Sequence, residues 1–193
     1  MIKTIAKRAA IAAATLLASA PLWAATLSLQ PSTASVAQGG SFTVDLLVSD
    51  LGTGDDLGSF DLSVLFDASV LQLNGYTLGT GLGDTAAGEA LDASAGLTAS
   101  GSLNLSQVSF LWDLSSQASS FKLASLTFNA AQVGNSALSI SGVTLGDAWG
   151  SSLNATTVAS AVAVTAAVPE PETLALMLAG LGVVGVALRR HAA

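Results

Sequence analysis

The chain has 193 residues, of which 51% are hydrophobic and 10% charged, and it contains no cysteine. Residues 26–168 carry eleven carboxylates against one lysine, Lys122, a net charge of −10 that repels phosphate backbones and excludes nucleic acid as a partner. The same residues contain no His, Cys or Arg, which excludes Ser-His and Cys-His nucleophiles and thiolate or imidazole zinc sites. We therefore expect a protein that is not an enzyme.

Residues 1–25 have the pattern of a secretory signal peptide. Three cationic residues precede a short apolar stretch, residues 9–20, and small residues follow at Ala24 and Ala25. The stretch is shorter than the roughly 20 apolar residues that span a bilayer, although an N-terminal anchor helix remains the alternative. Cleavage after Ala24 or Ala25 would leave a chain exported through the inner membrane. Because disulfides are allowed there and cysteine is absent, the domain must be stabilised by its core alone.

Residues 26–166 predict a β domain, because apolar and polar residues alternate between short turns. Phe60, Leu62 and Val64 share one face of a predicted strand, and Asp61 and Ser63 share the other. Further runs of this kind are residues 26–29, 42–48, 70–78, the region of residue 97, 103–112, 121–128, 137–145 and 156–164. Short strands at this spacing favour an all-β fold, an antiparallel β-sandwich of about eight or nine strands.

One predicted strand, residues 103–112, changes phase along its length. Leu103 and Leu105 share a phase that Val108 and Trp112 do not, a slip of one residue. The slip predicts a β-bulge near residues 106–107. It also places Trp112 in the core in preference to the surface.

Several segments of the predicted domain resemble cohesin domains, which have a jelly-roll sandwich related to carbohydrate-binding modules. The resemblance covers about 120 residues and rests on residues 41–50, 57–73, 123–128 and 134–147. Residues 66–71, Phe-Asp-Ala-Ser-Val-Leu, resemble the aromatic-Asp-Pro-x-x-Leu turn of the family, with Ala68 in place of proline. We expect Asp67 to cap a tight turn while Val70 and Leu71 pack inward. Cohesins bind dockerins, but no dockerin-contacting residue can be matched in this chain.

A second apolar segment, residues 173–188, lies near the C-terminus and is followed by Arg189 and Arg190. It predicts a transmembrane helix with the arginines as its stop on the cytoplasmic side. Sixteen helical residues reach about 24 Å, somewhat less than the roughly 30 Å of a hydrocarbon core.

Residues 167–193 as a whole resemble a PEP-CTERM sorting signal. The resemblance rests on Pro169, Glu170 and Pro171, then the glycine-rich apolar run, then the arginine pair at the end. It implies that an exosortase, a membrane transpeptidase-like enzyme, recognises the tripeptide. The membrane would then be a transient or retained anchor before delivery to the cell surface or extracellular matrix. A simple anchor behind a proline-rich stalk is the alternative.

Two aromatic residues in predicted turns are candidates for ligand binding. Trp149 lies in a glycine-flanked turn, and Tyr76 follows the Asn74-Gly75 turn. Aromatic faces stack on the apolar faces of sugar rings as they do on other rings, so these residues predict carbohydrate binding.

Three aspartates are candidates for calcium binding. Asp50, Asp55 and Asp56 share a glycine-rich loop, and Ca²⁺ takes several oxygen ligands. Their spacing fits no EF-hand, and solvated turn carboxylates are the alternative.

These observations predict a secreted surface or matrix protein with a carbohydrate-binding or adhesive module. Its partners would be an exosortase and either extracellular polysaccharide or a surface protein. Two alternatives remain at this point: a cohesin-type protein–protein scaffolding module, and a structural matrix component without a specific ligand.

Overall fold

The computed structural model describes residues 24–52, 54–167 and 176–181. Strand formation follows the alternation of apolar and polar residues. In β4 (Leu57–Leu65), Phe60, Leu62 and Val64 are buried and Asp61 is exposed. In chain order the strands are β1 (Ala25–Pro31), β2 (Ser35–Ala37), β3 (Ser41–Ser49), β4, β5 (Leu71–Leu78), β6 (Ala90–Asp92), β7 (Gly96–Ala99), β8 (Ser102–Ser109), β9 (Phe121–Ala130), β10 (Gly134–Asp147), β11 (Ser152–Leu153), β12 (Ala155–Val158) and β13 (Ser160–Thr165).

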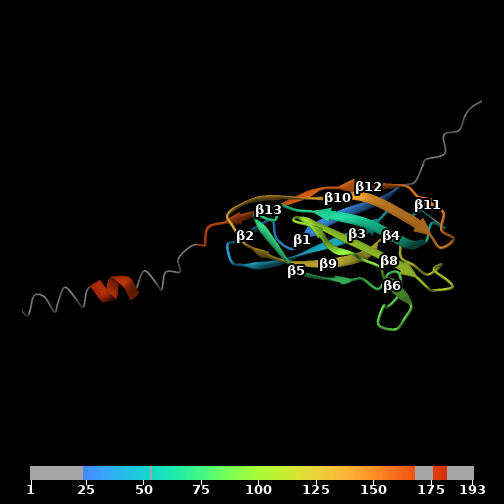
Figure 1. Ribbon diagram of the computed structural model, residues 1–193, viewed down its shortest axis with the longest axis horizontal. Helices are drawn as coiled ribbons and strands as arrows, with labels where there is room; N and C mark the ends of the chain where they lie inside the picture. Colours follow the sequence, from blue (N-terminus) through green and yellow to red (C-terminus); the bar gives the residue numbers. More distant parts are fainter. Residues whose placement is uncertain (1–23, 53, 168–175, 182–193) are drawn as a thin grey trace, which may run out of the picture.

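The strands form two stacked sheets, an all-β sandwich (Figure 1). The five-stranded sheet has the order β12-β1-β3-β9-β5. The second sheet has the order β2-β13-β10-β4-β8-β6, with β11 paired to β10 and β7 to β8. At one side of the sandwich the chain crosses from one sheet to the other. This happens between β1 and β2 and again between β12 and β13, whose members lie in different sheets. The other side lies between β5 of one sheet and β6 and β7 of the other.

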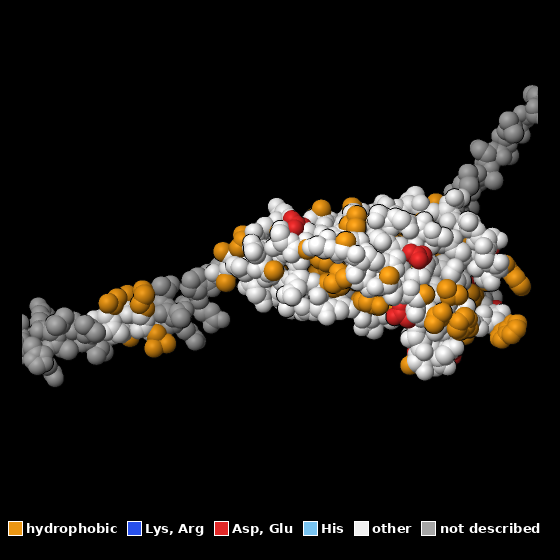
Figure 2. All heavy atoms as spheres, viewed as in Figure 1, with side chains coloured by type: hydrophobic (Ala, Val, Ile, Leu, Met, Phe, Trp, Pro, Cys, Tyr) orange, Lys and Arg blue, Asp and Glu red, His pale blue; other side chains and the backbone are white. Residues whose placement is uncertain are grey.

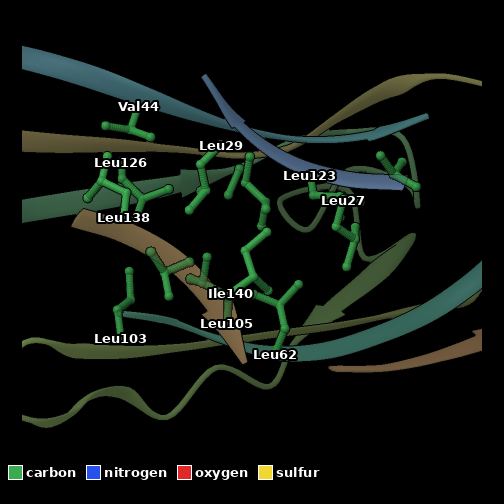
Figure 3. Packing of buried hydrophobic residues seen from close by; sticks show 14 of the residues in the cluster. Leu27, Leu29, Val44, Leu62, Leu103, Leu105, Leu123, Leu126, Leu138 and Ile140 are labelled. Carbon is green, nitrogen blue, oxygen red and sulfur yellow. The ribbon is translucent and has the colours of Figure 1, made fainter. Parts of the chain in front are cut away.

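The core lies between the sheets and is built mainly from leucine (Figure 3). Leu27, Leu126 and Leu62 are among the side chains that meet there from opposite sheets, and all three are fully buried. Each fully buried side chain of this size contributes roughly 1.5–3 kcal/mol.

The sandwich differs from the predicted one in the number of its strands and in the presence of parallel strand pairs. The described residues contain 13 strands, against the eight or nine expected, because β2, β6 and β11 are short and the predicted last strand divides into β12 and β13. The sandwich is not wholly antiparallel: β1 pairs with β12 and β13 pairs with β2 in parallel. These parallel pairs arise where the chain changes sheets.

The predicted β-bulge in β8 was wrong. Residues 102–108 of β8 pair with β4 in an unbroken register. Gln107, and not Val108, continues the inward phase of Leu103 and Leu105 and is fully buried, while Val108 lies on the outer face.

The turn predicted at residues 66–71 is confirmed. Asp67 Oδ1 accepts hydrogen bonds from the backbone N–H of Ser69 at 2.8 Å and from its hydroxyl at 2.6 Å. The N–H of Leu71 donates to Asp67 O at 2.8 Å, and Val70 and Leu71 are buried.

The structure gives no support to the predicted transmembrane helix. Within the described part of the chain, no helix is long and apolar enough to cross a membrane. The predicted span covers residues 173–188. Within it, residues 176–181 are helical, and the others lie outside the described residues.

Candidate binding surface

Four exposed apolar residues from two loops gather at one end of the sandwich. These residues are Phe110, Leu111, Trp112 and Trp149, and we refer to them as the aromatic surface. Trp112 is fully exposed and Trp149 is 92% exposed. Hydrophobic side chains are concentrated on this end of the molecule, near β6 (Figure 2). Exposed apolar patches are a feature by which interaction sites are recognised, so this surface is the candidate binding site.

The first loop follows β8 and is held at both of its ends. The N–H of Phe110 donates to Glu89 O at 2.7 Å, which continues the pairing of β6 with β8 by one position and holds the start of the loop. Further along, the Gln117 side chain accepts from Leu57 N at 2.7 Å and donates to Leu57 O at 3.0 Å and Gly81 O at 2.9 Å. Leu114 is buried beside this clamp. Trp112 therefore projects from a loop that is anchored on either side.

The second loop is the tight turn between β10 and β11. Asp147 Oδ1 accepts from Trp149 N at 2.8 Å and from Ser151 N at 2.7 Å. Gly150 has a φ of 82°, in the left-handed region that a side chain disfavours. The aspartate and the glycine fix the turn, and Trp149 lies at its tip.

The two loops enclose a shallow hollow of about 370 Å³, lined by the aromatic surface with Ser109 and Ala148. Asp113 directly follows Trp112, and Asp147 lies two residues before Trp149. The Ser115 hydroxyl and N–H lower the pKa of Asp113, and the Ser151 and Trp149 N–H groups lower the pKa of Asp147. Both groups are therefore charged hydrogen-bond acceptors at neutral pH. The hollow offers stacking faces, and the two carboxylates lie close to it along the chain but outside its lining.

The sequence located one of the four residues of this surface. Trp149 is exposed, as expected. The prediction that Trp112 belongs to the core was wrong, because β8 ends at Ser109 and its alternation does not extend to residue 112. Phe110 and Leu111 were not predicted as surface residues. No local signal places the two tryptophans together, since their loops meet only through the pairing of β8 and β10 with β4.

Tyr76 does not join the aromatic surface. It is half-buried, packs against the core, and donates through its hydroxyl to Asp92 Oδ2 at 3.5 Å. The structure therefore places the second predicted ligand-binding residue at the side of the sandwich between β5 and β6.

The three calcium candidates do not form a ligand set. Asp50 has a φ of 59°, and its carboxylate accepts a hydrogen bond from the Ser49 hydroxyl at 3.1 Å. Asp55 and Asp56 line a hollow with Gln117, and Asp50 is not part of that lining. Across residues 24–52, 54–167 and 176–181, no three His, Cys, Asp or Glu side chains are grouped so that they could hold a metal ion.

The predicted sorting residues Pro169, Glu170 and Pro171, and the predicted stop at Arg189 and Arg190, lie outside the described residues. Residues 167–190 match the family model of the PEP-CTERM protein-sorting motif. The resemblance stated from the sequence is therefore confirmed for this segment. No curated protein matches the chain with significance.

Similar solved structures are cohesin modules. The sixth cohesin of scaffoldin B from Acetivibrio cellulolyticus, solved with a dockerin, is 21% identical with a TM-score of 0.60, covering 74% of this chain and 99% of that one. A non-cellulosomal cohesin from Archaeoglobus fulgidus is 15% identical with a TM-score of 0.58, covering 74% and 92%. A cohesin module of a Clostridium perfringens family 33 glycoside hydrolase is 14% identical with a TM-score of 0.60, covering 75% and 97%. The chain therefore has a cohesin-type fold.

Proposed function

We propose that the protein is a non-catalytic, exported module that binds a neutral glycan of the extracellular matrix through its aromatic surface. Export is supported by the leader pattern of residues 1–25 and by the sorting motif at residues 167–190. Cleavage after Ala24 keeps β1 whole, because Ala25 is buried in it and its N–H donates to Asn154 O at 2.9 Å. An exosortase is the partner that the sorting motif implies.

The observation that carries the proposal is the exposure of two tryptophans on one hollow. Leaving a tryptophan side chain in water forgoes roughly 4–6 kcal/mol, at about 25 cal/mol per Å² over about 150–250 Å² of surface. Trp112 and Trp149 are both left exposed although the loops that carry them are fixed by hydrogen bonds. We infer that a ligand covers them.

The chemistry beside the rings favours a sugar. A pyranose offers an apolar face for stacking and a rim of hydroxyl donors. Asp113 and Asp147 are close in sequence to the two tryptophans, and in each of them Oδ1 accepts the backbone hydrogen bonds of its turn. We propose that the second carboxylate oxygen accepts from sugar hydroxyls at the edge of the hollow. The domain carries a net charge of −10 over residues 26–168, so it would repel an acidic polysaccharide. A neutral glycan is therefore the ligand class that fits.

The position of the surface relative to the sorting tail also suits binding away from the membrane. Strand β10 begins at Gly134, which pairs with Val164 just before the tail, and ends at Asp147 beside Trp149. Its 14 residues span about 40 Å. A module held at its C-terminal end would present the aromatic surface outward.

A second candidate function is binding of a protein partner. The cohesin-type fold favours it, because a similar structure from Acetivibrio cellulolyticus is a complex with a dockerin. In this chain the outer faces of β4 and β8 offer a polar surface for such a contact, where Asn104 donates to Asp61 at 2.9 Å.

The experiment is retention of the purified protein on extracellular matrix, with and without protease treatment of the matrix. We expect retention that survives protease and is competed by neutral oligosaccharide. Because a hot-spot tryptophan contributes more than about 1.4 kcal/mol, Trp112→Ala and Trp149→Ala should each weaken retention at least about tenfold. Val133→Ala is the control, since this exposed residue lies in the turn before β10, at the opposite end of that strand from Trp149.

Retention that is lost with protease and unchanged in both tryptophan variants would contradict the proposal and favour the protein partner. Retention on neither matrix would favour a structural component without a specific ligand.

A further inference from the structure

One edge of the five-stranded sheet is long and unpaired among the described strands. Strand β5 has eight residues and pairs with β9 alone. The other strands at sheet edges are short: four residues in β12 and β7, three in β2 and β6. A free strand edge presents rows of backbone donors and acceptors to any chain that can pair with it. The side of the sandwich at β5 is therefore its strongest template for strand addition.

The β5 edge lacks most of the features that protect edges in soluble proteins. Its sequence, Leu-Gln-Leu-Asn-Gly-Tyr-Thr-Leu, contains no charge and no proline. The one protective feature is a bulge between Leu73 and Gly75 in the pairing with β9. The bulge leaves two regular arms, residues 71–73 and 75–78.

An apolar groove lies beside the first arm. It has a volume of about 460 Å³, and its lining includes Phe66, Leu73 and Leu97 and no charged residue. Leu97 on β7 is 58% exposed. The groove is closed toward the second arm by the hydrogen bond from Tyr76 to Asp92. An uncharged groove beside an uncharged strand edge favours an uncharged segment as its occupant, whatever the charge of the chain that carries the segment.

We propose that two copies of this chain pair through antiparallel β5 edges about a two-fold axis. In a two-fold contact, a residue i that meets residue j of the partner is matched by residue j meeting the partner's residue i, so the strand must be complementary to itself. With the axis between Asn74 and Gly75, the arms pair crosswise: Leu71 lies opposite Leu78, and Gln72 opposite Thr77. Because neither arm is charged, no like charges meet. Five strands from each copy then form one continuous sheet.

The same pairing covers the groove. Leu71 and Leu78 pair with Ala130 and Ala124, which are buried, so both leucines lie on the inward face of β5. The partner's Leu78 therefore extends the apolar lining toward Leu97. This accounts for an exposed leucine at an open side of the core.

The test is sedimentation of the exported protein between about 5 μM and about 1 mM, where a dimer of moderate affinity would form. We expect the wild-type protein to dimerise with rising concentration. Gln72→Lys with Thr77→Lys places lysines opposite each other and should weaken dimerisation at least about tenfold. Gln72→Glu with Thr77→Glu should do the same, and mixing the two variants should restore a heterodimer. Thr43→Lys, an exposed position on the interior strand β3, is the charge control.

A wild-type protein that stays monomeric over this range would overturn the proposal. So would a dimer that the lysine pair does not affect, since it would use another surface. Protection of β5 amides from hydrogen exchange by an uncharged peptide of alternating threonine and valine, with the protein itself monomeric, would assign the edge to a foreign strand. The tryptophans are not part of this contact, so the result is independent of glycan binding.

Discussion

Asp67 illustrates at the scale of one residue how this domain fixes its turns. Its carboxylate accepts the hydroxyl and N–H of Ser69, and these bonds lower its pKa below the ordinary value of 3.8. The N–H of Asp67 in turn donates to the buried Ser136 hydroxyl at 2.9 Å. Asp113 and Asp147 repeat the device at the aromatic surface, each with a lowered pKa. Short-range bonds of this type suit a chain without disulfides.

The lowered pKa of Asp67 predicts a dependence of stability on pH. A carboxyl whose folded-state pKa is below its unfolded-state value stabilises the protein above about pH 4, and this contribution is lost as the pH falls through the folded-state pKa. We expect Asp67→Ala to lower the melting temperature at pH 7. The difference from the wild-type protein should narrow as the pH is lowered from 7 to below about 4.

Thermal unfolding followed by circular dichroism across this range is the measurement. A difference in melting temperature that stays constant down to the lowest pH would contradict the account. Ser69→Ala, which removes one of the two donors, should give a smaller effect of the same sign.

At the scale of elements, the alternation of side chains predicted most of the long strands. The alternation failed where a polar residue occupies an inward position of a strand or an apolar residue occupies an outward one. In β8, Gln107 is fully buried and Val108 lies outside, so an unbroken strand resembled a bulged one. The strands β6 and β11 are too short for any periodic signal. Strand β8 ends at Ser109, before the exposed Trp112, and the bond from Phe110 N to Glu89 O joins segments that the local pattern does not relate.

The loop that carries Trp112 gives a prediction for an element. Gln117 makes three hydrogen bonds that join this loop to Leu57 and Gly81. Gln117→Ala removes them and leaves the polar groups of the partly buried Leu57 backbone without these partners. We expect a loss of roughly 1–3 kcal/mol in the free energy of unfolding. Glycan binding should weaken as well, because the loop that holds Trp112 loosens.

Chemical denaturation and the retention assay together test this prediction. Gln132→Ala is a suitable control, because this exposed glutamine lies in the turn after β9. Unchanged stability in Gln117→Ala would show that the clamp does not hold the loop.

At the scale of the whole molecule, the aromatic surface and the residues that lead into the sorting tail lie at opposite ends of the sandwich. Strand β10 runs from the end that leads into the sorting tail to the end that carries Trp149. Processing of the tail and binding at the aromatic surface should therefore be independent. We expect alanine at Pro169, Glu170 and Pro171 to leave the unprocessed protein in the membrane fraction, with glycan binding unchanged.

Intact mass and fractionation are the measurements for the sorting motif. Normal processing of the triple variant would contradict the role assigned to these residues, and a simple anchor behind a proline-rich stalk would then be favoured.

The most direct test of the central claim uses the tryptophans themselves. The chain contains three, and the predicted cleavage after Ala24 or Ala25 would remove Trp23 and leave only Trp112 and Trp149, both on the aromatic surface. Intrinsic fluorescence of the exported protein therefore reports on this surface alone. On titration with neutral matrix polysaccharide, the account predicts a shift of the emission to shorter wavelength and protection from acrylamide quenching. Emission and quenching that stay unchanged while the polysaccharide retains the protein would contradict it.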